Sequence, residues 1–385
     1  MTERKIQLIA TAPMGLEAIV ARELKELGYT DQKVENGRVT FTGVPADICR
    51  TNLWLRTADR VLVKMGEFEA TTFDDLFEGT KALDWPDWIP GDGEFPVEGR
   101  SLKSQLSSVP ACQKIVKKAV VEKMKERYGT EWFPEDGARF VIEVNLLNDK
   151  ALLTLDTTGP GLHKRGYRKL VTEAPLKETM AAAILQLSRW APHRPLYDPF
   201  CGSGTFLVEA AMMGWNVAPG LRRSFNSEHW PLVPEELWEQ AREEAYDLVN
   251  DDIPLDIAGS DIDPAAIEVA EAAVKKAGFA KEIKLRTLPV SKAQPQGSYG
   301  VIVTNPPYGE RLLDDKEAEK TIKQLGFVYL MLQNWSLFAM SPSKQFEQSF
   351  TRNADKKRKL YNGRIECQLY QYMGPLPPRN RESDL

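Results

Sequence analysis

Apolar residues recur at strand and helix spacing along the first 156 residues. Leu16, Ile19, Val20 and Leu24 predict a helix over residues 15–27, which Gly28 ends. Further helices are expected at 45–56, 71–83 and 112–128, strands at 5–10, 38–41 and 60–69, and a hairpin at 139–147 and 151–156. The element order resembles βαβαβ. This half contains no glycine-rich phosphate loop, so we expect it to be non-catalytic.

Beyond residue 161 the pattern changes to strands that alternate with helices. Helices are expected at 176–190, 205–213 and 265–277, and strands at 195–198, 255–261 and 300–304. This alternation predicts an α/β domain with a parallel, doubly wound sheet, in which a ligand lies beyond the carboxyl ends of the strands. Residues 157–161 combine glycine, proline and small polar residues, which indicates a linker between the two halves.

The composition is that of a globular protein, with 385 residues of which 42% are hydrophobic and 27% charged. No run of about 18 apolar residues occurs, and residues 1–15 lack the apolar region of a signal peptide, so we expect a cytoplasmic protein with no membrane contact. The four cysteines are far apart and no histidine lies at metal-ligand spacing. We therefore expect neither a disulfide framework nor a bound metal.

Charge is distributed unevenly. The net charge of -5 argues against a dedicated phosphate binder, but residues 161–169 and 355–364 are locally basic and contain tyrosine. A single basic run is usually a solvated surface, whereas two runs that flank a catalytic domain favour RNA binding through phosphate contacts and base stacking. The predicted RNA-binding residues are Lys164, Arg165, Arg168, Lys356, Lys357, Arg358 and Lys359.

A glycine-rich motif, Asp-Pro-Phe-Cys-Gly-Ser-Gly-Thr, follows the strand expected at 195–198. Gly202 and Gly204 let the backbone turn tightly before a helix whose first N–H groups are free to bind a small polar ligand. Leu207 departs from the spacing of a dinucleotide-binding loop, and the motif has no P-loop lysine. A plain turn between a strand and a helix remains the alternative.

A second motif, Gly-Ser-Asp-Ile-Asp-Pro, spans residues 259–264 at the end of the next strand. The carboxylate of Asp261 can accept hydrogen bonds from both hydroxyls of a ribose. Asp263 precedes Pro264, a pair typical of a helix N-cap followed by proline at the first helical position.

A third motif, Asn-Pro-Pro-Tyr-Gly-Glu-Arg, begins at residue 305 after another strand. An exocyclic amine of a base is a weak nucleophile because its lone pair is delocalised into the ring. The Asn305 side-chain oxygen and a backbone carbonyl fixed by Pro306 and Pro307 can each accept one N–H of such an amine, and Tyr308 can stack on the base. These residues are the predicted catalytic set, although asparagine and proline also favour simple turns.

The motif at 198–205 resembles the cofactor loop of class I S-adenosylmethionine-dependent methyltransferases. By this resemblance, Gly202–Gly204 lies along the amino-acid part of the cofactor and Asp198 holds its ammonium group. The cofactor-binding residues would be Asp198, Pro199, Cys201, Gly202, Ser203, Gly204, Thr205, Asp261, Ile262, Val290 and Asn305. Residues 287–292 lack the acidic or amide side chain that often contacts adenine, so Val290 backbone or the Ser291 hydroxyl would replace it. Cys201 is expected to pack rather than act as a nucleophile.

The extension Asn-Pro-Pro-Tyr-Gly-Glu-Arg-Leu is similar to the RlmL/YpsC-type methyltransferases, which form N2-methylguanine in large-subunit ribosomal RNA. Residues 35–38, 52–60, 107–110, 161–168, 173–179 and 355–364 also resemble that family. The resemblance implies a ferredoxin-like lead-in at 1–44, a THUMP RNA-binding domain at 45–156, a linker at 157–165 and a Rossmann-like methyltransferase domain at 166–385. It implies one methylation activity, on 23S ribosomal RNA.

Two alternatives remain open. The Asn-Pro-Pro-Tyr tetrapeptide also suits an adenine-N6 methyltransferase that acts on DNA or RNA. A non-catalytic RNA-binding or ribosome-assembly protein could keep the fold without the chemistry.

Overall fold

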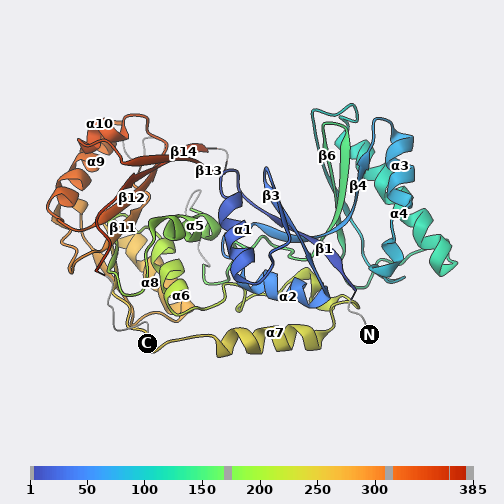
Figure 1. The fold of residues 1–385 in the computed structure, drawn as a ribbon, viewed down its shortest axis with the longest axis horizontal. Coiled ribbons are helices and arrows are strands. Elements are labelled where there is room, and N and C mark those ends of the chain that lie inside the picture. Colours follow the sequence, from blue (N-terminus) through green and yellow to red (C-terminus); the bar gives the residue numbers. More distant parts are fainter. Residues whose placement is uncertain (1–3, 169–175, 308–314, 364, 379–385) are drawn as a thin grey trace. The chain divides into compact units, whose positions relative to one another are not determined.

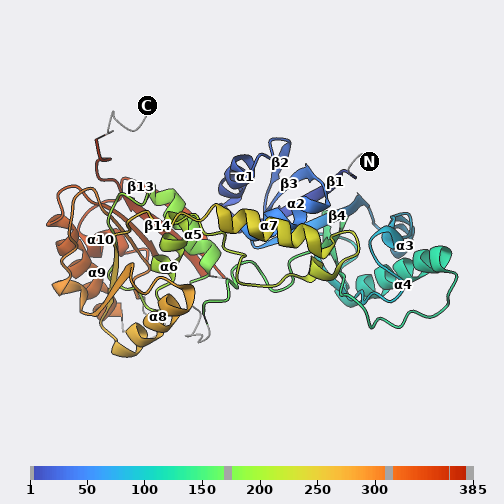
Figure 2. The same cartoon turned by 90° about the horizontal axis from the view of Figure 1, so that it is seen from below.

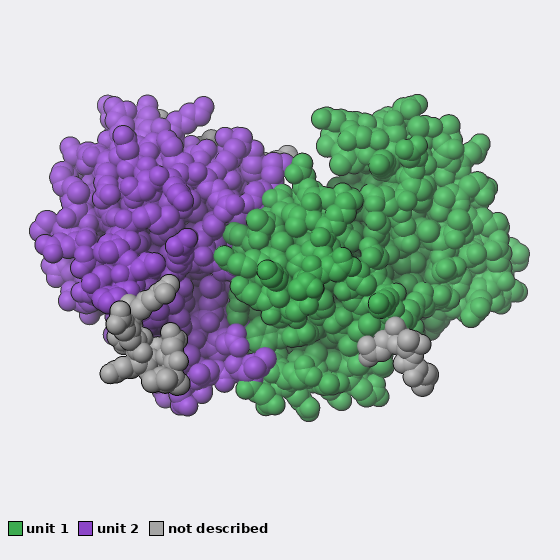
Figure 3. All heavy atoms as spheres, in the orientation of Figure 1, with its two compact units in different colours: residues 1–13, 17–162, 218–247 green, residues 14–16, 163–217, 248–385 purple. Residues whose placement is uncertain are grey.

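The computed structural model describes residues 4–168, 176–307, 315–363 and 365–378. The chain forms two compact units, which Figure 3 shows in green and purple. Unit 1 contains Met1–Pro13, Glu17–Leu162 and Ala218–Asp247, and unit 2 contains Met14–Leu16, His163–Val217 and Leu248–Leu385. Within the described ranges, no helix is both long and apolar enough to cross a membrane.

Unit 1 is built on one sheet in the order β2-β3-β1-β4-β7-β6-β5. All neighbouring strands are antiparallel except β5 and β6, which are parallel. The strands are β1 (Ile6–Thr11), β2 (Gln32–Glu35), β3 (Arg38–Gly43), β4 (Arg60–Glu69), β5 (Val97–Leu102), β6 (Val141–Leu147) and β7 (Lys150–Asp156). The predicted hairpin is confirmed as β6 and β7, and β4 coincides with the strand expected at 60–69.

The first part of unit 1 has the order β1, α1 (Glu17–Glu26), β2, β3, α2 (Pro45–Trp54) and β4. The pattern predicted both helices but omitted β2. This strand lies at the edge of the sheet and has only Val34 as an apolar residue, so it shows no alternation. Its turn into β3 uses Gly37, whose φ of 77° lies in the left-handed region.

The second part of unit 1 adds two helices, α3 (Phe73–Lys81) and α4 (Val109–Tyr128), which pack on each other. Cys112, Val116 and Val120 recur at four-residue spacing on α4, and their side chains are buried. Gly129 ends α4 with a φ of 64°. Both helices were predicted: α3 is two residues shorter at each end than expected, and α4 begins three residues earlier and ends at Tyr128 as expected.

A segment from the C-terminal half of the sequence completes unit 1. Residues 218–247 include α7 (Glu235–Asp247), which packs against α2, as Figure 2 shows. Trp230 stacks on Phe140 with ring centroids 4.7 Å apart, and Trp238 stacks on Phe225 at 5.0 Å. These aromatic side chains belong to the core of unit 1. The helical periodicity of α7 was not recognised from the sequence.

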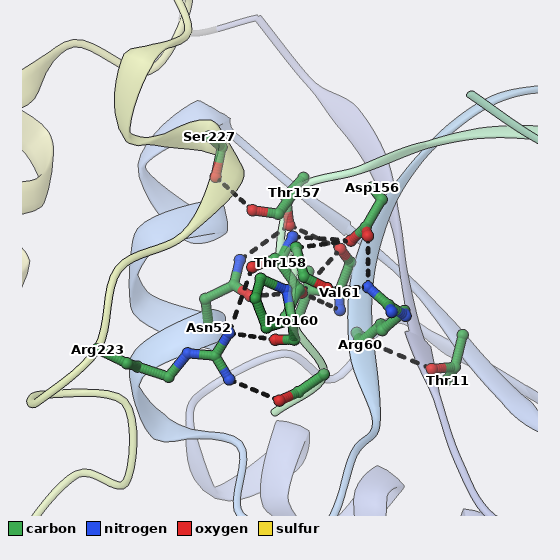
Figure 4. Close-up of polar contacts among 12 residues, drawn as sticks. Thr11, Asn52, Arg60, Val61, Asp156, Thr157, Thr158, Pro160, Arg223 and Ser227 are labelled. Carbon is green, nitrogen blue, oxygen red and sulfur yellow. Dashed lines mark hydrogen bonds and ion pairs between the residues drawn. The ribbon is translucent and has the colours of Figure 1, made fainter. Parts of the chain in front are cut away.

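Residues 157–161, predicted as a linker, lie within unit 1, and Figure 4 shows polar contacts of this segment. Thr157 and Thr158 are fully buried. Asn52 donates from Nδ2 to Thr157 Oγ1 at 2.9 Å and accepts from Thr158 Oγ1 at 2.7 Å. Arg223 donates to the Gly161 carbonyl at 2.7 Å. The small polar residues of this segment therefore satisfy buried hydrogen bonds instead of forming a solvated connection.

Unit 2 has the sheet order β10-β9-β8-β11-β12-β14-β13, and Figure 1 shows it with its covering helices. Its strands are β8 (Leu196–Asp198), β9 (Ile257–Asp261), β10 (Ile283–Thr287), β11 (Val301–Thr304), β12 (Ser336–Ser341), β13 (Lys356–Asn362) and β14 (Ile365–Tyr372). The first five are parallel, and β14 is antiparallel to both β12 and β13. The helices are α5 (Glu178–Ser188), α6 (Thr205–Gly214), α8 (Pro264–Ala277), α9 (Asp315–Leu330) and α10 (Phe346–Phe350). The predicted doubly wound α/β fold is confirmed.

The chain order reverses between β8 and β11. From β8 the chain adds β9 and β10 on one side of the sheet, whereas β11 pairs with β8 on the other side. Such a switch point leaves a crevice beyond the carboxyl ends of the strands, where open α/β sheets bind their ligands. The three sequence motifs follow β8, β9 and β11.

Candidate active site

Asp198 ends the short, buried strand β8 and is itself only 1% exposed. Its Oδ1 accepts hydrogen bonds from Thr304 Oγ1 at 2.6 Å and from the Phe200 N–H at 3.1 Å. Burial raises the pKa of Asp198 to about 7, because the desolvation of the carboxylate outweighs these two hydrogen bonds. The group can therefore change its charge near neutral pH and would hold a cation only in its ionised form.

The glycine-rich loop turns from β8 into α6 through two left-handed residues. Gly202 has a φ of 49° and Gly204 a φ of 74°. Apart from Gly202 and its two chain neighbours, no described residue has a heavy atom within 4 Å of the position that a Gly202 Cβ would occupy. A Gly204 Cβ would lie 3.3 Å from Ala270 Cβ on α8. Gly202 thus leaves space at the loop, while Gly204 permits the close packing of two helices.

Asp261 links the second motif to this loop. Its Oδ2 accepts the Gly202 N–H at 3.0 Å, and its Oδ1 accepts the Asp263 N–H at 3.0 Å. Ile262 beside it is 71% exposed. Asp263 caps α8 by accepting the Ala265 N–H at 2.9 Å, with Pro264 at the first helical position, as predicted. The structure thus brings the first two motifs together.

The predicted adenine segment lies next to Asp261. The Leu288 N–H donates to the Asp261 carbonyl at 2.8 Å, which fixes the chain beyond β10. Val290 is 3% exposed and belongs to the core of unit 2, so only its backbone is a candidate for a ligand contact. Cys201 is 5% exposed, and burial holds the pKa of its thiol well above the usual range. It packs as expected and is unsuited to act as a thiolate nucleophile.

Asn305 follows β11 directly. The residue before it, Thr304, donates the hydrogen bond to Asp198. Asn305 Oδ1 is buried and has no hydrogen-bond partner among the residues that the structure describes. An unpaired buried oxygen costs about 1–3 kcal/mol, so such a group in a crevice points to a ligand donor. Pro306 is buried after it, and Tyr308 lies outside the described residues.

Thr304 is a site residue that sequence reasoning missed. It is 0% exposed and joins the ends of β8 and β11 through its hydrogen bond to Asp198. The only signal was its place between a buried apolar strand and Asn305. A polar residue at that place has to find a partner inside the protein.

The predicted RNA-binding residues divide into two groups. Arg165 is 3% exposed and pairs with the buried Glu209, and the side chain of Arg168 is only 10% exposed. Their burial does not fit phosphate contacts, so we leave both out of the proposed RNA surface. Lys164 is exposed, as are Lys356, Lys357 and Lys359 on the edge strand β13, while Arg358 is half-buried.

Three family models match the chain. The model described as "RMKL-like, methyltransferase domain" matches residues 165–371, and the RlmL ferredoxin-like domain and the THUMP domain match residues 7–62 and 70–156. The chain belongs to the RMKL-like methyltransferase family. The resemblance found in the sequence is thereby confirmed, and the domain boundaries at 44, 156 and 165 stay predictions.

Relatives in this family extend over the whole chain. The Bacillus subtilis protein "Putative RNA methyltransferase YpsC" is 49% identical over 383 residues, which cover 99% of each chain. The "Ribosomal RNA large subunit methyltransferase K/L" of Shewanella baltica is 32% identical, over 95% of this chain and 53% of that protein. The present chain therefore matches about half of the Shewanella protein.

Solved structures of similar chains have the same fold. A "predicted N6-adenine-specific DNA methylase" from Listeria monocytogenes is 51% identical, with a TM-score of 0.92 over 97% of both chains. The structure of SMU.472, named a "putative methyltransferase", is a complex with SAH. It is 46% identical, with a TM-score of 0.92 over 98% of this chain and 100% of that one.

Proposed function

We propose that this member of the family transfers a methyl group from S-adenosylmethionine to the exocyclic N2 amine of a guanine in 23S ribosomal RNA. The chain is an S-adenosylmethionine-dependent RNA methyltransferase, as its family, its THUMP domain and the similar structure in complex with SAH indicate. The choice of base and of RNA is the proposal. The observation that carries methyl transfer to an exocyclic amine is the buried oxygen of Asn305, which has no hydrogen-bond partner among the described residues.

The residues at the ends of β8 and β9 fit this cofactor. Open space at Gly202 lets the backbone approach the amino-acid part, and the Asp198 carboxylate suits its ammonium group. The Asp261 carboxylate suits ribose hydroxyls, and exposed Ile262 offers an apolar surface for adenine. S-adenosylmethionine supplies the methyl group when it is bound there.

Asn305 would orient the amine of the base. Its Oδ1 accepts one N–H, and the carbonyl fixed by the following prolines accepts the other. This turns the nitrogen lone pair toward the methyl group, so that transfer needs no covalent intermediate with the enzyme. The predicted stacking of the base on Tyr308 completes this arrangement.

The choice of 23S ribosomal RNA rests on similarity and on charge. The Shewanella relative bears the name of a large-subunit ribosomal RNA methyltransferase, and the sequence at residues 305–312 resembles the motif of methyltransferases that form N2-methylguanine. THUMP domains bind structured RNA, and the exposed lysines of β13 supply cations for phosphates. We therefore retain Lys164, Lys356, Lys357, Arg358 and Lys359 as proposed RNA contacts.

A second candidate is adenine-N6 methylation. It is favoured by the name of the Listeria structure, a predicted N6-adenine-specific DNA methylase, and by the shared Asn-Pro-Pro-Tyr tetrapeptide. An adenine N6 amine would present the same two N–H donors to Asn305 and the backbone. The catalytic motif therefore suits both bases, and the product has to be identified.

Nucleoside analysis after methyl transfer tests the proposal. The full chain and labelled S-adenosylmethionine are incubated with large-subunit ribosomal RNA from cells that lack this enzyme, and with assembling subunits from the same cells. We expect label in N2-methylguanosine. Label in N6-methyladenosine would assign the second candidate, while no transfer to RNA, particles or DNA would favour a non-catalytic role.

A further inference from the structure

In the stretch that contains Arg165 and Arg168, the side chains of Arg165 and Tyr167 are buried in unit 2, whereas Lys164 and Gly166 are exposed. Arg165 Nε and Nη2 each lie 3.3 Å from an oxygen of Glu209 on α6, and Tyr167 donates to the same carboxylate at 3.1 Å. Glu209 is 0% exposed. A fully buried carboxylate requires such partners, so these contacts fix the stretch against α6.

Arg168 reaches the cofactor loop itself. Its Nη2 donates to Thr205 Oγ1 at 2.6 Å and to the Leu176 carbonyl at 3.1 Å, and lies 3.4 Å from Glu178 Oε1 on α5. Its Nε is buried and has no partner within the described part of the chain. One guanidinium therefore connects α5 to the first residue of α6.

Thr205 occupies the point where the glycine loop becomes a helix. It follows Gly204 directly, and its hydroxyl lies 3.2 Å from Ser203 Oγ. A donor that fixes this hydroxyl limits the positions open to Gly202–Gly204, because glycine has more backbone freedom than any other residue. Loop position in turn sets where the first N–H groups of α6 point.

We propose that Arg168 is a positioning residue for the amino-acid end of the cofactor and acts through Thr205. The inference rests on the proposed cofactor site at Gly202–Gly204. In this proposal the adenosine part of the cofactor lies at Asp261 and Ile262. Arg168 contacts neither residue in the described structure. Replacing Arg168 should therefore weaken only the binding of ligands that have an amino-acid end. This selectivity separates positioning from a general loss of stability.

The test compares two ligands and two buried arginines. S-adenosylhomocysteine has the amino-acid end, and 5′-methylthioadenosine lacks it. Arg168→Met is compared with Arg194→Met as a matched control. Arg194 lies in unit 2 as well and is 2% exposed, but it donates to the carbonyls of Tyr299 and Arg189, away from the glycine loop. Both ligands are titrated by calorimetry into the full chain.

We expect Arg168→Met to weaken S-adenosylhomocysteine binding about tenfold, which corresponds to about 1.4 kcal/mol, and to change 5′-methylthioadenosine binding less than about twofold. Arg194→Met should lower the melting temperature and leave both affinities unchanged. Equal losses for both ligands, or no loss for either, would overturn the inference. A wild-type protein that binds neither ligand would instead overturn the proposed cofactor site, and this inference with it.

Two further variants cover the case in which Arg168→Met does not fold. Arg168→Lys keeps a donor for Thr205 and should retain more S-adenosylhomocysteine affinity than the methionine variant. Thr205→Val removes the acceptor and should show the same ligand selectivity. Weaker binding of ribosomal RNA by Arg168→Lys, with unchanged S-adenosylhomocysteine affinity, would show a contact with RNA and contradict the positioning role.

Discussion

Asp198 and Asn305 lie at the carboxyl ends of neighbouring strands, β8 and β11, but their side-chain oxygens have opposite surroundings. Asp198 Oδ1 accepts two hydrogen bonds, one of them from Thr304, the residue before Asn305. Asn305 Oδ1 is buried with no partner in the described residues. The carboxylate is held by the protein before any ligand binds, whereas the amide oxygen still needs a donor.

This difference separates two tasks at one edge of the sheet. A preset carboxylate fits the binding of a cofactor whose position has to be constant. An unpaired acceptor fits a substrate group that arrives, reacts and leaves, because its hydrogen bond forms only when the amine is present. The predictions below test whether these tasks are separable.

The largest expected change in cofactor affinity comes from Asp198→Asn. Asparagine keeps an oxygen for Thr304 and Phe200 but has no negative charge for the cofactor ammonium. Loss of a buried charge pair costs about 2–5 kcal/mol, so S-adenosylhomocysteine affinity at pH 7.5 should fall at least about 30-fold. Calorimetric titration measures it. An unchanged affinity would remove Asp198 from the cofactor site.

The pH dependence of cofactor binding should follow the same carboxyl. Its pKa of about 7 means that the ionised form, which pairs with the ammonium, becomes rarer below neutral pH. The affinity for S-adenosylhomocysteine should rise by up to about tenfold per pH unit from pH 5.5 to 7 and then level off.

The stability of the ligand-free protein should change with pH in the opposite direction to the cofactor affinity. The pKa is higher in the folded state than the usual value of about 4, so the stability of the ligand-free protein should fall as pH rises from about 4 to 7. Asp198→Asn is the control for both profiles. A persistent pH dependence of binding in that variant would assign it to another group.

A smaller and separate effect is expected at the edge strand β13. Changing Lys356, Lys357 and Lys359 to glutamine removes three exposed cations, of which Lys357 and Lys359 already pair with Glu347 and Glu366. Ribosomal RNA affinity should fall about tenfold and its salt dependence should weaken by up to about 0.7–0.9 per lost phosphate contact. S-adenosylhomocysteine affinity should not change. A loss of cofactor binding instead would contradict the separation of RNA and cofactor sites.

The smallest effect is expected from Thr304→Val, which keeps the shape but removes the donor to Asp198. Because this hydrogen bond lowers the pKa of Asp198, its loss should move the midpoint of the pH profile of binding upward. At pH 7 the affinity for S-adenosylhomocysteine should fall about two- to fivefold. A midpoint that stays in place would show that Thr304 does not stabilise the carboxylate.

Most of the elements that position the site could be predicted from the sequence. The strands before residues 198, 261 and 305 alternate with clear helices, and the turn residues mark their ends. The weaker elements were missed for physical reasons. β2 is a polar edge strand. β12 to β14 follow the catalytic motif, and local periodicity does not determine which of these strands pair in the sheet.

The basic stretches show why the candidate site could be predicted only in part. Both are rich in arginine and lysine, yet Arg165 and Arg168 hold buried carboxylates, and Lys356 and Lys359 are exposed. Composition cannot distinguish these cases, because it does not show that Arg165 pairs with Glu209, 44 residues away, or that Arg168 pairs with Glu178 on the next helix. The partner of Asp198, Thr304, is separated from it by 106 residues.

Single-turnover methyl transfer by Asn305→Ala tests the central claim most directly. With saturating labelled S-adenosylmethionine and ribosomal RNA, we expect the rate to fall about 100- to 1,000-fold, while S-adenosylhomocysteine affinity stays within about twofold of wild type. Asn305→Asp, which keeps an acceptor oxygen, should retain measurable transfer. An Asn305→Ala variant that transfers methyl groups at the wild-type rate would contradict the assignment of its buried oxygen to the substrate amine.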